Sequence, residues 1–394
     1  MKRDDLPAIP LLDLKAQWRA LRDELMPAIE AVCESQHFIL GPNVAALERE
    51  VADYCGAAHG IGTSSGTDAL LLALMALGVG PGDAVLTTPY SFFATAGVVA
   101  RLGARTVFCD VEADTLNLSP DAVRETIRRR CTVRDGGLAM RDGAGERVRV
   151  LLPVHLYGQC ADLPALAAIA AEHGLALVED AAQAIGAELA GGARAGSVGT
   201  IGCFSFFPSK NLGAFGDAGL CTTADPALAE RMRVLRVHGG KPKYHHAVVG
   251  ANLRLDELQA AILRVKLGHL DAWTAARGHN AARYDAALRA AGLEGAIGLP
   301  VVRPGQRHVF NQYVIRSPRR DALREHLAAH RIGTEVYYPV PLHLQPCFAS
   351  LGYAPGDCPV AEAAAAETLA LPIHPDLAPG HVDAVVAAIA DFHR

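Results

Sequence analysis

Lys210 has the sequence surroundings of a nucleophilic amine. It is the only charged residue between Arg194 and Asp217, and it follows the largely apolar run CFSFFP at 203–208. A lysine that is desolvated among aromatic side chains has a lowered pKa, so its neutral amine can attack an aldehyde. The alternative is a lysine that extends from a surface loop with its ammonium in water. The apolar neighbours favour an imine-forming lysine.

The segment GTSSGTD at 62–68 has the composition of a phosphate-binding helix start. It leads directly into an apolar helical run, so its small residues expose backbone N–H groups at the positive end of the helix dipole. A plain helix N-cap explains the same residues. The segment contains no lysine, and the glycines at 78–82 follow a helical run, so neither matches a Walker loop or a dinucleotide fingerprint.

Two carboxylates, Glu179 and Asp180, end the apolar strand-like run at 175–178. Side chains alternate along a strand, so these two point to opposite faces and one can face a ligand crevice. An aspartate beside a pyridine nitrogen keeps that nitrogen protonated, which makes the ring an electron sink. A helix N-cap is the competing role for Asp180. Lys210, Asp180 and the phosphate-binding segment are the three parts that a pyridoxal 5'-phosphate (PLP) enzyme needs.

Alternating helical and strand-like segments must position these residues. Strands separated by helices predict an α/β fold with a mainly parallel, mixed sheet covered by helices on both faces. Ligands in such sheets bind at the carboxyl ends of the strands, where Asp180 lies. We expect helices at 14–34, 67–77, 91–102 and 162–173, and strands at 84–88, 105–109, 148–154 and 175–179, with a strand pair within 200–222.

The pattern changes near residue 255. Longer helical stretches at 255–270 and 273–291 are followed by strand-like pieces at 308–316 and 333–338 and then by a proline-rich loop. At 394 residues the chain exceeds the size at which a single core stops growing. We therefore expect a large domain at 1–254, including an N-terminal helix, and a smaller α+β domain at 255–394.

Composition excludes several classes of protein. The net charge of −5 and the absence of a long basic block give no footprint for nucleic acid or an anionic membrane. No signal peptide or membrane-spanning run is recognisable. The nine cysteines never form Cys-x-x-Cys, so we expect reduced thiols and a cytoplasmic protein. We expect no metal, because His238, His245, His246 and His343 lack ligand spacing.

Eight runs in this chain resemble the DegT/StrS-type nucleotide-sugar aminotransferases, in the order of that family and over nearly the whole chain. The resemblance implies a fold-type I PLP enzyme, related to aspartate aminotransferase, that works as a homodimer. The runs are GTSSGTDALLLALMALGVGPGD, TTPYSFFATAG, PVHLYGQCADL, VEDAAQAIGA, FSFFPSKNLGAFGDAG, HGGKPKYHHAVVGANLRLDELQAAIL, HVFNQYVIR and YYPVPLHLQP.

The resemblance also implies roles for individual residues. Lys210 would form the Schiff base and carry the proton between amino acid and cofactor, while Asp180 would pair with the pyridinium nitrogen. Gln183 would lie near the 3-hydroxyl of the ring, and Phe92 would stack on its face. The phosphate would be bound by Ser65, Gly66, Thr67 and Ser205 and, from the neighbouring subunit, by Asn252.

A further set of matching positions is expected to face the substrate. It comprises His155, Tyr157, Lys241, Tyr244, His245, His308, Asn311, Gln312 and Tyr313. The expected reaction moves an amino group from L-glutamate to a nucleotide-linked keto-sugar, with a 3-keto deoxyhexose or hexuluronate favoured over a 4-keto sugar. Its place would be amino-sugar biosynthesis for a surface polysaccharide or a glycosylated metabolite.

Three alternatives stay open beside this reading. A cyclitol or other non-nucleotide keto substrate is compatible with the same cofactor residues. A non-catalytic PLP-binding regulatory protein is disfavoured by the complete set of Lys210, Asp180 and Gln183. Sugar deoxygenation is disfavoured because family dehydratases carry histidine where Lys210 stands.

One segment departs from the family pattern. Residues 131–147 are polar and glycine-rich where relatives have a short turn. We expect an exposed, mobile hairpin or loop without a catalytic role. Deletion of residues 134–145 is expected to leave activity intact.

Overall fold

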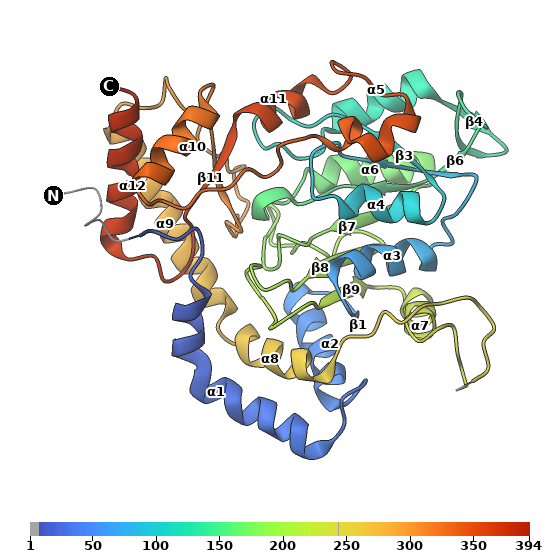
Figure 1. Cartoon of the computed structure of the whole chain (residues 1–394). Coiled ribbons are helices and arrows are strands. Elements are labelled where there is room, and N and C mark those ends of the chain that lie inside the picture. The colour runs from blue at the N-terminus through green and yellow to red at the C-terminus, as the bar shows by residue number, and fades with distance from the viewer. Residues whose placement is uncertain (1–7, 243) are drawn as a thin grey trace.

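A mixed sheet forms the centre of the computed structural model, which describes residues 8–242 and 244–394 (Figure 1). Its strand order is β1-β9-β8-β7-β6-β2-β3, and β9 alone runs antiparallel to its neighbours along this path. The predicted α/β class with a mainly parallel sheet is confirmed. The bounds are β1 (His59–Thr63), β2 (Asp83–Thr87), β3 (Arg105–Phe108), β6 (Arg147–Leu152), β7 (Ala176–Asp180), β8 (Ile201–Ser205) and β9 (Gly219–Thr223).

Helices cover both faces of the sheet because strand residues alternate between two apolar cores. Val85 of β2 lies in the core shared with α3, α4 and α7, while its neighbour Leu86 lies in the core shared with α2, α5, α6 and α8. The bounds are α2 (Pro42–Cys55), α3 (Gly66–Ala76), α4 (Ala94–Arg101), α5 (Pro120–Arg130), α6 (Leu163–His173), α7 (Pro226–Leu235) and α8 (Glu257–Leu267).

The C-terminal part has its own core around a two-stranded antiparallel sheet of β10 (Tyr313–Arg316) and β11 (Thr368–Leu371). The strand expected at 333–338 is wrong, because this segment makes only an isolated bridge from Glu335 to Ala370. The strand expected at 308–316 is shorter. The helices are α9 (Leu270–Ala290), α10 (Arg320–Ala329), α11 (Pro359–Glu367) and α12 (Pro379–Phe392), with 3-10 turns η2 (Leu156–Gly158), η3 (Leu342–Leu344) and η4 (Pro346–Leu351).

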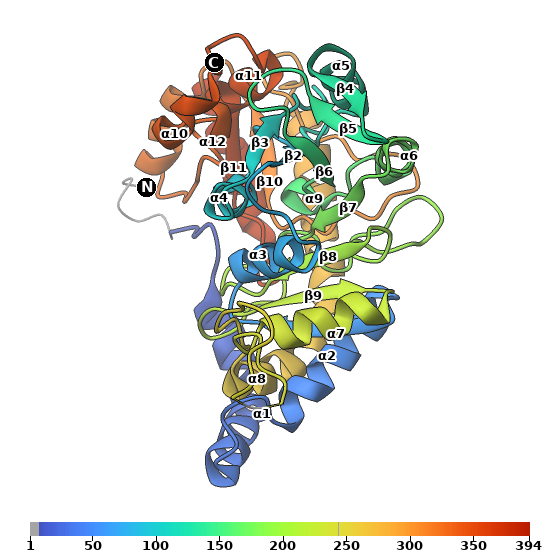
Figure 2. The same ribbon diagram turned by 90° about the vertical axis from the view of Figure 1, so that its right-hand side faces the viewer.

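Helix α8 packs with the large part of the molecule. It lies against α1 (Leu14–Ser35) and α2, and its Ala260 and Leu263 belong to the core beneath the sheet. Figures 1 and 2 show α1, α2 and α8 together at one end and α10 and α12 at the other. The division at 254/255 stays a prediction, and the C-terminal core draws on α9 from Ala281 onward. No helix in the described part of the chain is long and apolar enough to cross a membrane.

The inserted segment is a hairpin of β4 (Cys131–Arg134) and β5 (Gly137–Met140), which joins the sheet through a pairing of Ala139 with Arg147. The expected hairpin is present, but the expectation that it is exposed is wrong for β5. Leu138 and Met140 are only 4% and 2% exposed and belong to the sheet's core. Asp142 pairs with Arg105 at 3.0 Å and with Arg130 at 3.1 Å. Three successive residues of β5, Leu138 to Met140, are thus buried, while residues 132–134 of β4 are exposed.

Candidate active site

Lys210 lies in the loop that connects the antiparallel strands β8 and β9. Its side chain is half-buried, and desolvation lowers the pKa of its ammonium to about 8, while the Asp180 carboxylate acts in the opposite direction. Among the described residues, none accepts a hydrogen bond from this ammonium or forms an ion pair with it. Lys210 therefore has the protonation behaviour and the freedom that a nucleophilic amine requires.

Helix α8 anchors the Lys210 loop from below. The Gln259 side chain accepts from the backbone N–H of Phe215 at 2.8 Å and donates to its carbonyl at 3.2 Å. The Lys266 ammonium donates to the Gly213 carbonyl at 2.7 Å and lies 4.5 Å from the centre of the Phe215 ring. Four contacts from one helix thus fix the far side of the loop, which limits the positions that Lys210 can take.

Asp180 ends β7 and is buried next to the Lys210 loop. Its carboxylate accepts from the Thr95 hydroxyl at 2.8 Å and from the Ala182 N–H at 3.2 Å. Burial raises its pKa, and these two hydrogen bonds and Lys210 lower it in part. No described lysine or arginine forms an ion pair with it. A buried carboxylate without a paired cation is suited to a protonated ring nitrogen of a ligand.

Glu179 points away from Asp180, as the strand alternation predicted. Burial raises its pKa, but the hydrogen bond from His155 at 2.9 Å and those from the Gly196 and Gly199 N–H groups lower it below the usual range. The other His155 nitrogen accepts from the Ala161 N–H at 3.1 Å. With both nitrogens engaged and no exposed surface, His155 supports the strand end and offers no free group to a substrate.

The first turn of α3 faces the end of β8. The Ser65 hydroxyl caps the helix by accepting from the Asp68 N–H at 3.0 Å, so the N-cap role is real. The amides of Gly66 and Thr67 precede the first intrahelical bonds and have no partner among the described residues. A Cβ on Gly66 would lie 2.5 Å from the Cβ of Ser205. The structure thus places Ser65, Gly66, Thr67 and Ser205 together.

Gln183 connects the sheet to a tyrosine from the C-terminal part. Its carbonyl accepts from the Tyr157 N–H at 2.6 Å, and its amide donates to the Tyr338 hydroxyl at 3.0 Å. Burial and the Asp180 charge raise the pKa of Tyr338, and its ring lies 6.2 Å from that of Phe92. Phe92 is 57% exposed. Tyr338 therefore belongs to the site, although sequence reasoning did not single it out.

Thr95 is the second missed residue. Its hydroxyl contacts both Asp180 and Ser91, the latter at 2.8 Å. The spacing of Ser91 and Thr95 by one helical turn is a sequence signal for a shared face, but nothing local to them indicates Asp180 as the partner. The pair shows that the TTPYSFFATAG run contributes to the site through a hydroxyl as well as through its aromatic residues.

Hydroxyl groups join the two parts of the molecule near the site. The Tyr90 hydroxyl donates to the Tyr337 carbonyl at 2.8 Å and accepts from the Tyr338 N–H at 3.1 Å. The Tyr157 hydroxyl also donates to the Tyr337 carbonyl. These bonds use the Tyr337 carbonyl and the Tyr338 N–H, which are therefore not available for strand pairing. They also engage the hydroxyl of Tyr157, which was expected to face the substrate.

The other residues expected to face the substrate do not form one cluster within the described chain. Tyr313 lies in the C-terminal core with its hydroxyl 2.6 Å from Asp285, so a substrate role for it is not supported. His308 stacks on Phe310 at 4.0 Å, and burial lowers its pKa to about 3. The Asn311 amide donates to the Gln312 side chain at 2.6 Å, and Asn311 is buried.

The segment between α7 and α8 extends away from the sheet (Figure 1). It carries Lys241, which pairs with Glu230, and Tyr244, which is 81% exposed. His245 and Asn252 lie on the same segment and are exposed. The backbone next to Asn252 contacts the candidate phosphate segment, because the Ser64 N–H donates to the Leu253 carbonyl at 3.1 Å.

The chain matches known proteins along nearly its whole length. It is 50% identical over 390 residues to the "Pleiotropic regulatory protein" of Geobacillus stearothermophilus, covering 98% of this chain and 99% of the relative. It is 44% identical to the dTDP-3-amino-3,4,6-trideoxy-alpha-D-glucose transaminase of Streptomyces venezuelae, covering 99% and 97%. It is 45% identical to the UDP-N-acetyl-3-dehydro-alpha-D-glucosamine 3-aminotransferase of Acidithiobacillus ferrooxidans, covering 94% of each.

Solved structures give the same result. DesV of S. venezuelae, in complex with a ketimine intermediate, superposes with a TM-score of 0.90 at 43% identity over 98% of both chains. NtdA of Bacillus subtilis, with bound cofactor PMP, superposes with a TM-score of 0.83 at 28% identity over 98% of this chain and 84% of the other. Residues 19–390 match the family described as DegT/DnrJ/EryC1/StrS aminotransferase. The protein therefore belongs to the DegT/DnrJ/EryC1/StrS aminotransferase family.

Proposed function

We propose that this aminotransferase uses PLP to move an amino group from L-glutamate to the keto carbon of a nucleotide-linked sugar. The observation that supports this most directly is the proximity of two groups that lack bonded partners of opposite charge. Lys210 has a pKa lowered to about 8 and no bonded acceptor among the described residues, and none of those residues forms an ion pair with the buried Asp180. An aldehyde and a protonated ring nitrogen would satisfy these two groups together.

The residues present fit PLP at three points. Asp180 offers a buried carboxylate to the ring nitrogen, and Gln183 lies beside it with its amide near Tyr338. The free amides of Gly66 and Thr67 and the Ser205 hydroxyl form a neutral, N–H-rich recess of the kind that binds phosphate. The contact of Gly66 with Ser205 leaves no room for a larger side chain at position 66, because a Cβ there would clash.

When bound, the cofactor supplies a carbonyl carbon for amine attack and an electron sink for the α-carbon of the donor. The side chains of the chain do the rest. The Lys210 amine, neutral in part near pH 8, would be the nucleophile for that carbonyl carbon, with water as the leaving group, and would later take and return the proton at the substrate carbon. Asp180 would keep a proton on the ring nitrogen, and the Thr95 hydroxyl fixes the carboxylate for that role.

The supporting residues keep this geometry. Glu179, with the His155 and backbone donors, ties the end of β7 to the loop at 196–199. Tyr338 and its bond to Gln183 cover the site from the C-terminal part and help to exclude water. We propose that Asn252 of a second subunit contributes to the phosphate site, so that the functional unit is a homodimer.

We further propose a 3-keto sugar, either a deoxyhexose or a hexuluronate, as the acceptor. The names of the S. venezuelae and A. ferrooxidans relatives refer to a 3-amino sugar and a 3-dehydro sugar, which supports position 3. The product would serve amino-sugar biosynthesis for a surface polysaccharide or a glycosylated metabolite. A cyclitol acceptor is the alternative, since the cofactor residues do not distinguish it.

A regulatory role is the second candidate, and one observation favours testing it: a relative at 50% identity is named a pleiotropic regulatory protein. The unpartnered Lys210 and the buried Asp180 argue for turnover, because a binding protein has no need of a reactive amine. Spectroscopy separates the two roles directly.

The test is a visible absorption spectrum of the purified protein before and after L-glutamate, followed by a panel of nucleotide keto-sugars and cyclitol ketones. Loss of the cofactor band with glutamate and its return with one acceptor would support the proposal and identify the acceptor. A cofactor band that glutamate and other amino donors leave unchanged would support the regulatory role. The absence of any band after reconstitution with PLP would overturn the proposed function.

A further inference from the structure

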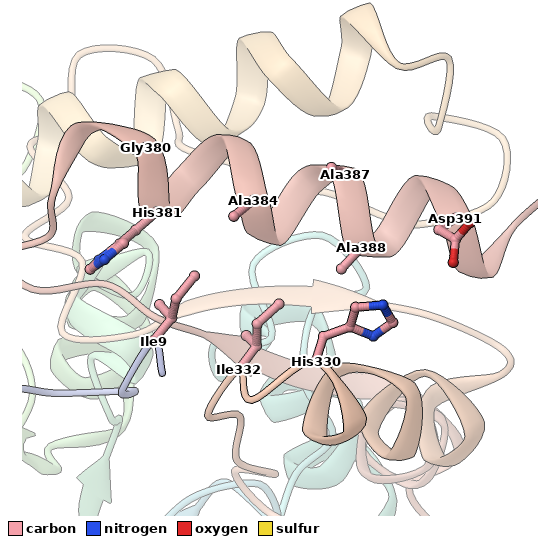
Figure 3. A pocket seen from close by; sticks show the side chains of 9 residues that line it. All are labelled: Ile9, His330, Ile332, Gly380, His381, Ala384, Ala387, Ala388 and Asp391. Atoms are coloured by element: carbon pink, nitrogen blue, oxygen red, sulfur yellow. The ribbon is translucent and has the colours of Figure 1, made fainter. Parts of the chain in front are cut away.

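A cavity of about 540 Å³ lies between helix α12 and the end of α10, in the C-terminal part of the chain. Figure 3 shows His381 at one end of it and His330 with Asp391 at the other, while Ile9, Ile332 and alanines of α12 form the apolar wall between them. The cluster of interest is His326, His330 and Asp391, which we call the α10–α12 triad. None of these residues belongs to the site around Lys210.

The triad has the spacing of metal ligands. His326 and His330 are four residues apart at the C-terminal end of α10, so both rings lie on one helix face. One ring nitrogen of each and a carboxylate oxygen of Asp391 lie within 4.8 Å of one another. His326 Nε2 is 3.8 Å from Asp391 Oδ2, too far for a hydrogen bond. Two ligands of a tetrahedral zinc ion lie about 3.4 Å apart, so small rotations of the side chains suffice.

The ring nitrogens are also free in the way that metal binding requires. His330 Nδ1 is 2.8 Å from the His326 carbonyl, which fixes the proton on Nδ1 and leaves the lone pair of Nε2 available. Metal-binding histidines commonly have their second nitrogen bonded in this manner. His326 Nε2 is shielded from solvent and has no hydrogen-bond partner in the described structure. A bound cation would satisfy this buried nitrogen.

We propose that His326, His330 and Asp391 bind a divalent transition-metal ion such as Zn²⁺, with the remaining coordination position open to water. Three protein ligands from two helices would connect α12 to α10 and stabilise the C-terminal part of the molecule. This proposal differs from the expectation of no metal, which rested on other histidines. A protonated His326 paired with Asp391 is the competing explanation, and it needs neither a metal nor His330.

The test uses tag-free full-length protein, dialysed against a chelator and titrated with Zn²⁺ by calorimetry. Wild type is expected to bind one tight equivalent. His330→Gln and Asp391→Asn are expected to weaken this binding at least about tenfold, because each removes one ligand. The matched control is His381→Gln, which lines the same cavity at its other end and should bind like wild type. Wild type without a stoichiometric equivalent, or variants that all bind equally, would overturn the proposal.

Thermal unfolding gives an independent readout. Zn²⁺ is expected to raise the Tm of wild type and of His381→Gln, but not of His330→Gln or Asp391→Asn, since only a site present in the folded state is linked to stability. All four proteins should unfold at similar temperatures in chelator, which separates ligand loss from misfolding. The spectral response to L-glutamate should be the same in each, so failure of the metal site remains distinct from failure of the proposed aminotransferase activity.

Discussion

Two lysines at the loop between β8 and β9 differ in their environments. Lys210 lies in the loop and is half-buried, whereas Lys266 contacts the loop from α8 and is buried. Burial lowers the pKa of both Lys210 and Lys266 to about 8. Lys266 is 2% exposed, donates to the Gly213 carbonyl and lies over the Phe215 ring. The Lys210 ammonium has no bonded acceptor in the described chain, and the carboxylate that acts on it is Asp180. Both lysines therefore have a lowered pKa, and only their partners distinguish the proposed nucleophile, Lys210, from Lys266, which holds the loop in place.

The largest expected effect is that of Lys210→Met. We expect a folded protein that binds PLP only non-covalently and loses at least about three orders of magnitude in transamination rate, because both the nucleophile and the proton carrier are absent. Reduction with borohydride followed by peptide mapping should find the cofactor on residue 210 in wild type. Near-wild-type turnover in Lys210→Met would remove the distinction between the two lysines.

Asp180→Asn should come next, with a loss of about a hundredfold or more in rate. The neutral amide cannot hold a proton on the ring nitrogen, although it preserves the shape of the carboxylate and can still contact Thr95. The measurement is the rate of the half-reaction with L-glutamate at saturating cofactor. Thr95→Val is the milder variant. Its half-reaction rate is expected to fall less than that of Asp180→Asn, because the charge of the Asp180 carboxylate remains. Equal rates for Asp180→Asn and wild type would contradict the assigned role.

Lys266→Met is expected to reduce the half-reaction rate by roughly tenfold or less. Methionine fills the space and removes a buried charge, so the free energy of unfolding should stay within about 1 kcal/mol of wild type. The Gly213 carbonyl, however, loses its hydrogen-bond donor. The Lys210 loop should then position its amine less well. A loss as large as that of Lys210→Met would mean that the anchor takes part in the chemistry.

The pH dependence distinguishes the lysines further. The rate at which apoprotein forms a covalent adduct with PLP should rise with pH and level off above a midpoint near 8, since the neutral amine is the reactive form.

The stability of the fold should also depend on pH, because both lysines have a lower pKa in the folded chain than in the unfolded chain. Between about pH 8 and pH 10.5 the unfolded chain therefore binds more protons, and the free energy of unfolding rises with pH in this range. In urea titrations, Lys266→Met should reduce this rise. A capture midpoint near 10.5 would contradict the buried environment of Lys210.

Deletion of residues 134–145 should have the smallest effect on catalysis. The hairpin contacts neither lysine region, so turnover per folded molecule should match wild type. Stability should fall, because Leu138 and Met140 leave the core beneath the sheet. The measurements are the Tm of the deletion protein and the specific activity of its folded fraction, each compared with wild type. A large loss of turnover in well-folded deletion protein would connect the insertion to the site.

Local patterns were enough for the parts of the fold that depend on neighbouring residues. The alternation of strands and helices, the opposed directions of Glu179 and Asp180, and the isolation of Lys210 are all readable within a few residues of each position. Strand β11 was missed because it follows an alanine-rich run at 361–366 that continues a helical pattern. Residues 368–371 form a strand because they pair with β10, and the local sequence pattern does not reveal this long-range pairing.

Periodicity in the sequence determined the α/β class, and side-chain chemistry indicated Lys210, Asp180 and the segment at 62–68 as candidates. The other cofactor residues, such as Gln183 and Asn252, were predicted from the resemblance of the motifs to the family. Only the tertiary structure decided which groups meet. Thr95 and Asp180 are 85 residues apart, and Gln183 and Tyr338 are 155 apart. The same holds for the anchor at Lys266 and for the α10–α12 triad. Burial and partners are properties of the folded chain, and they distinguish the proposed nucleophile from the second lysine and the proposed metal ligands from the other histidines.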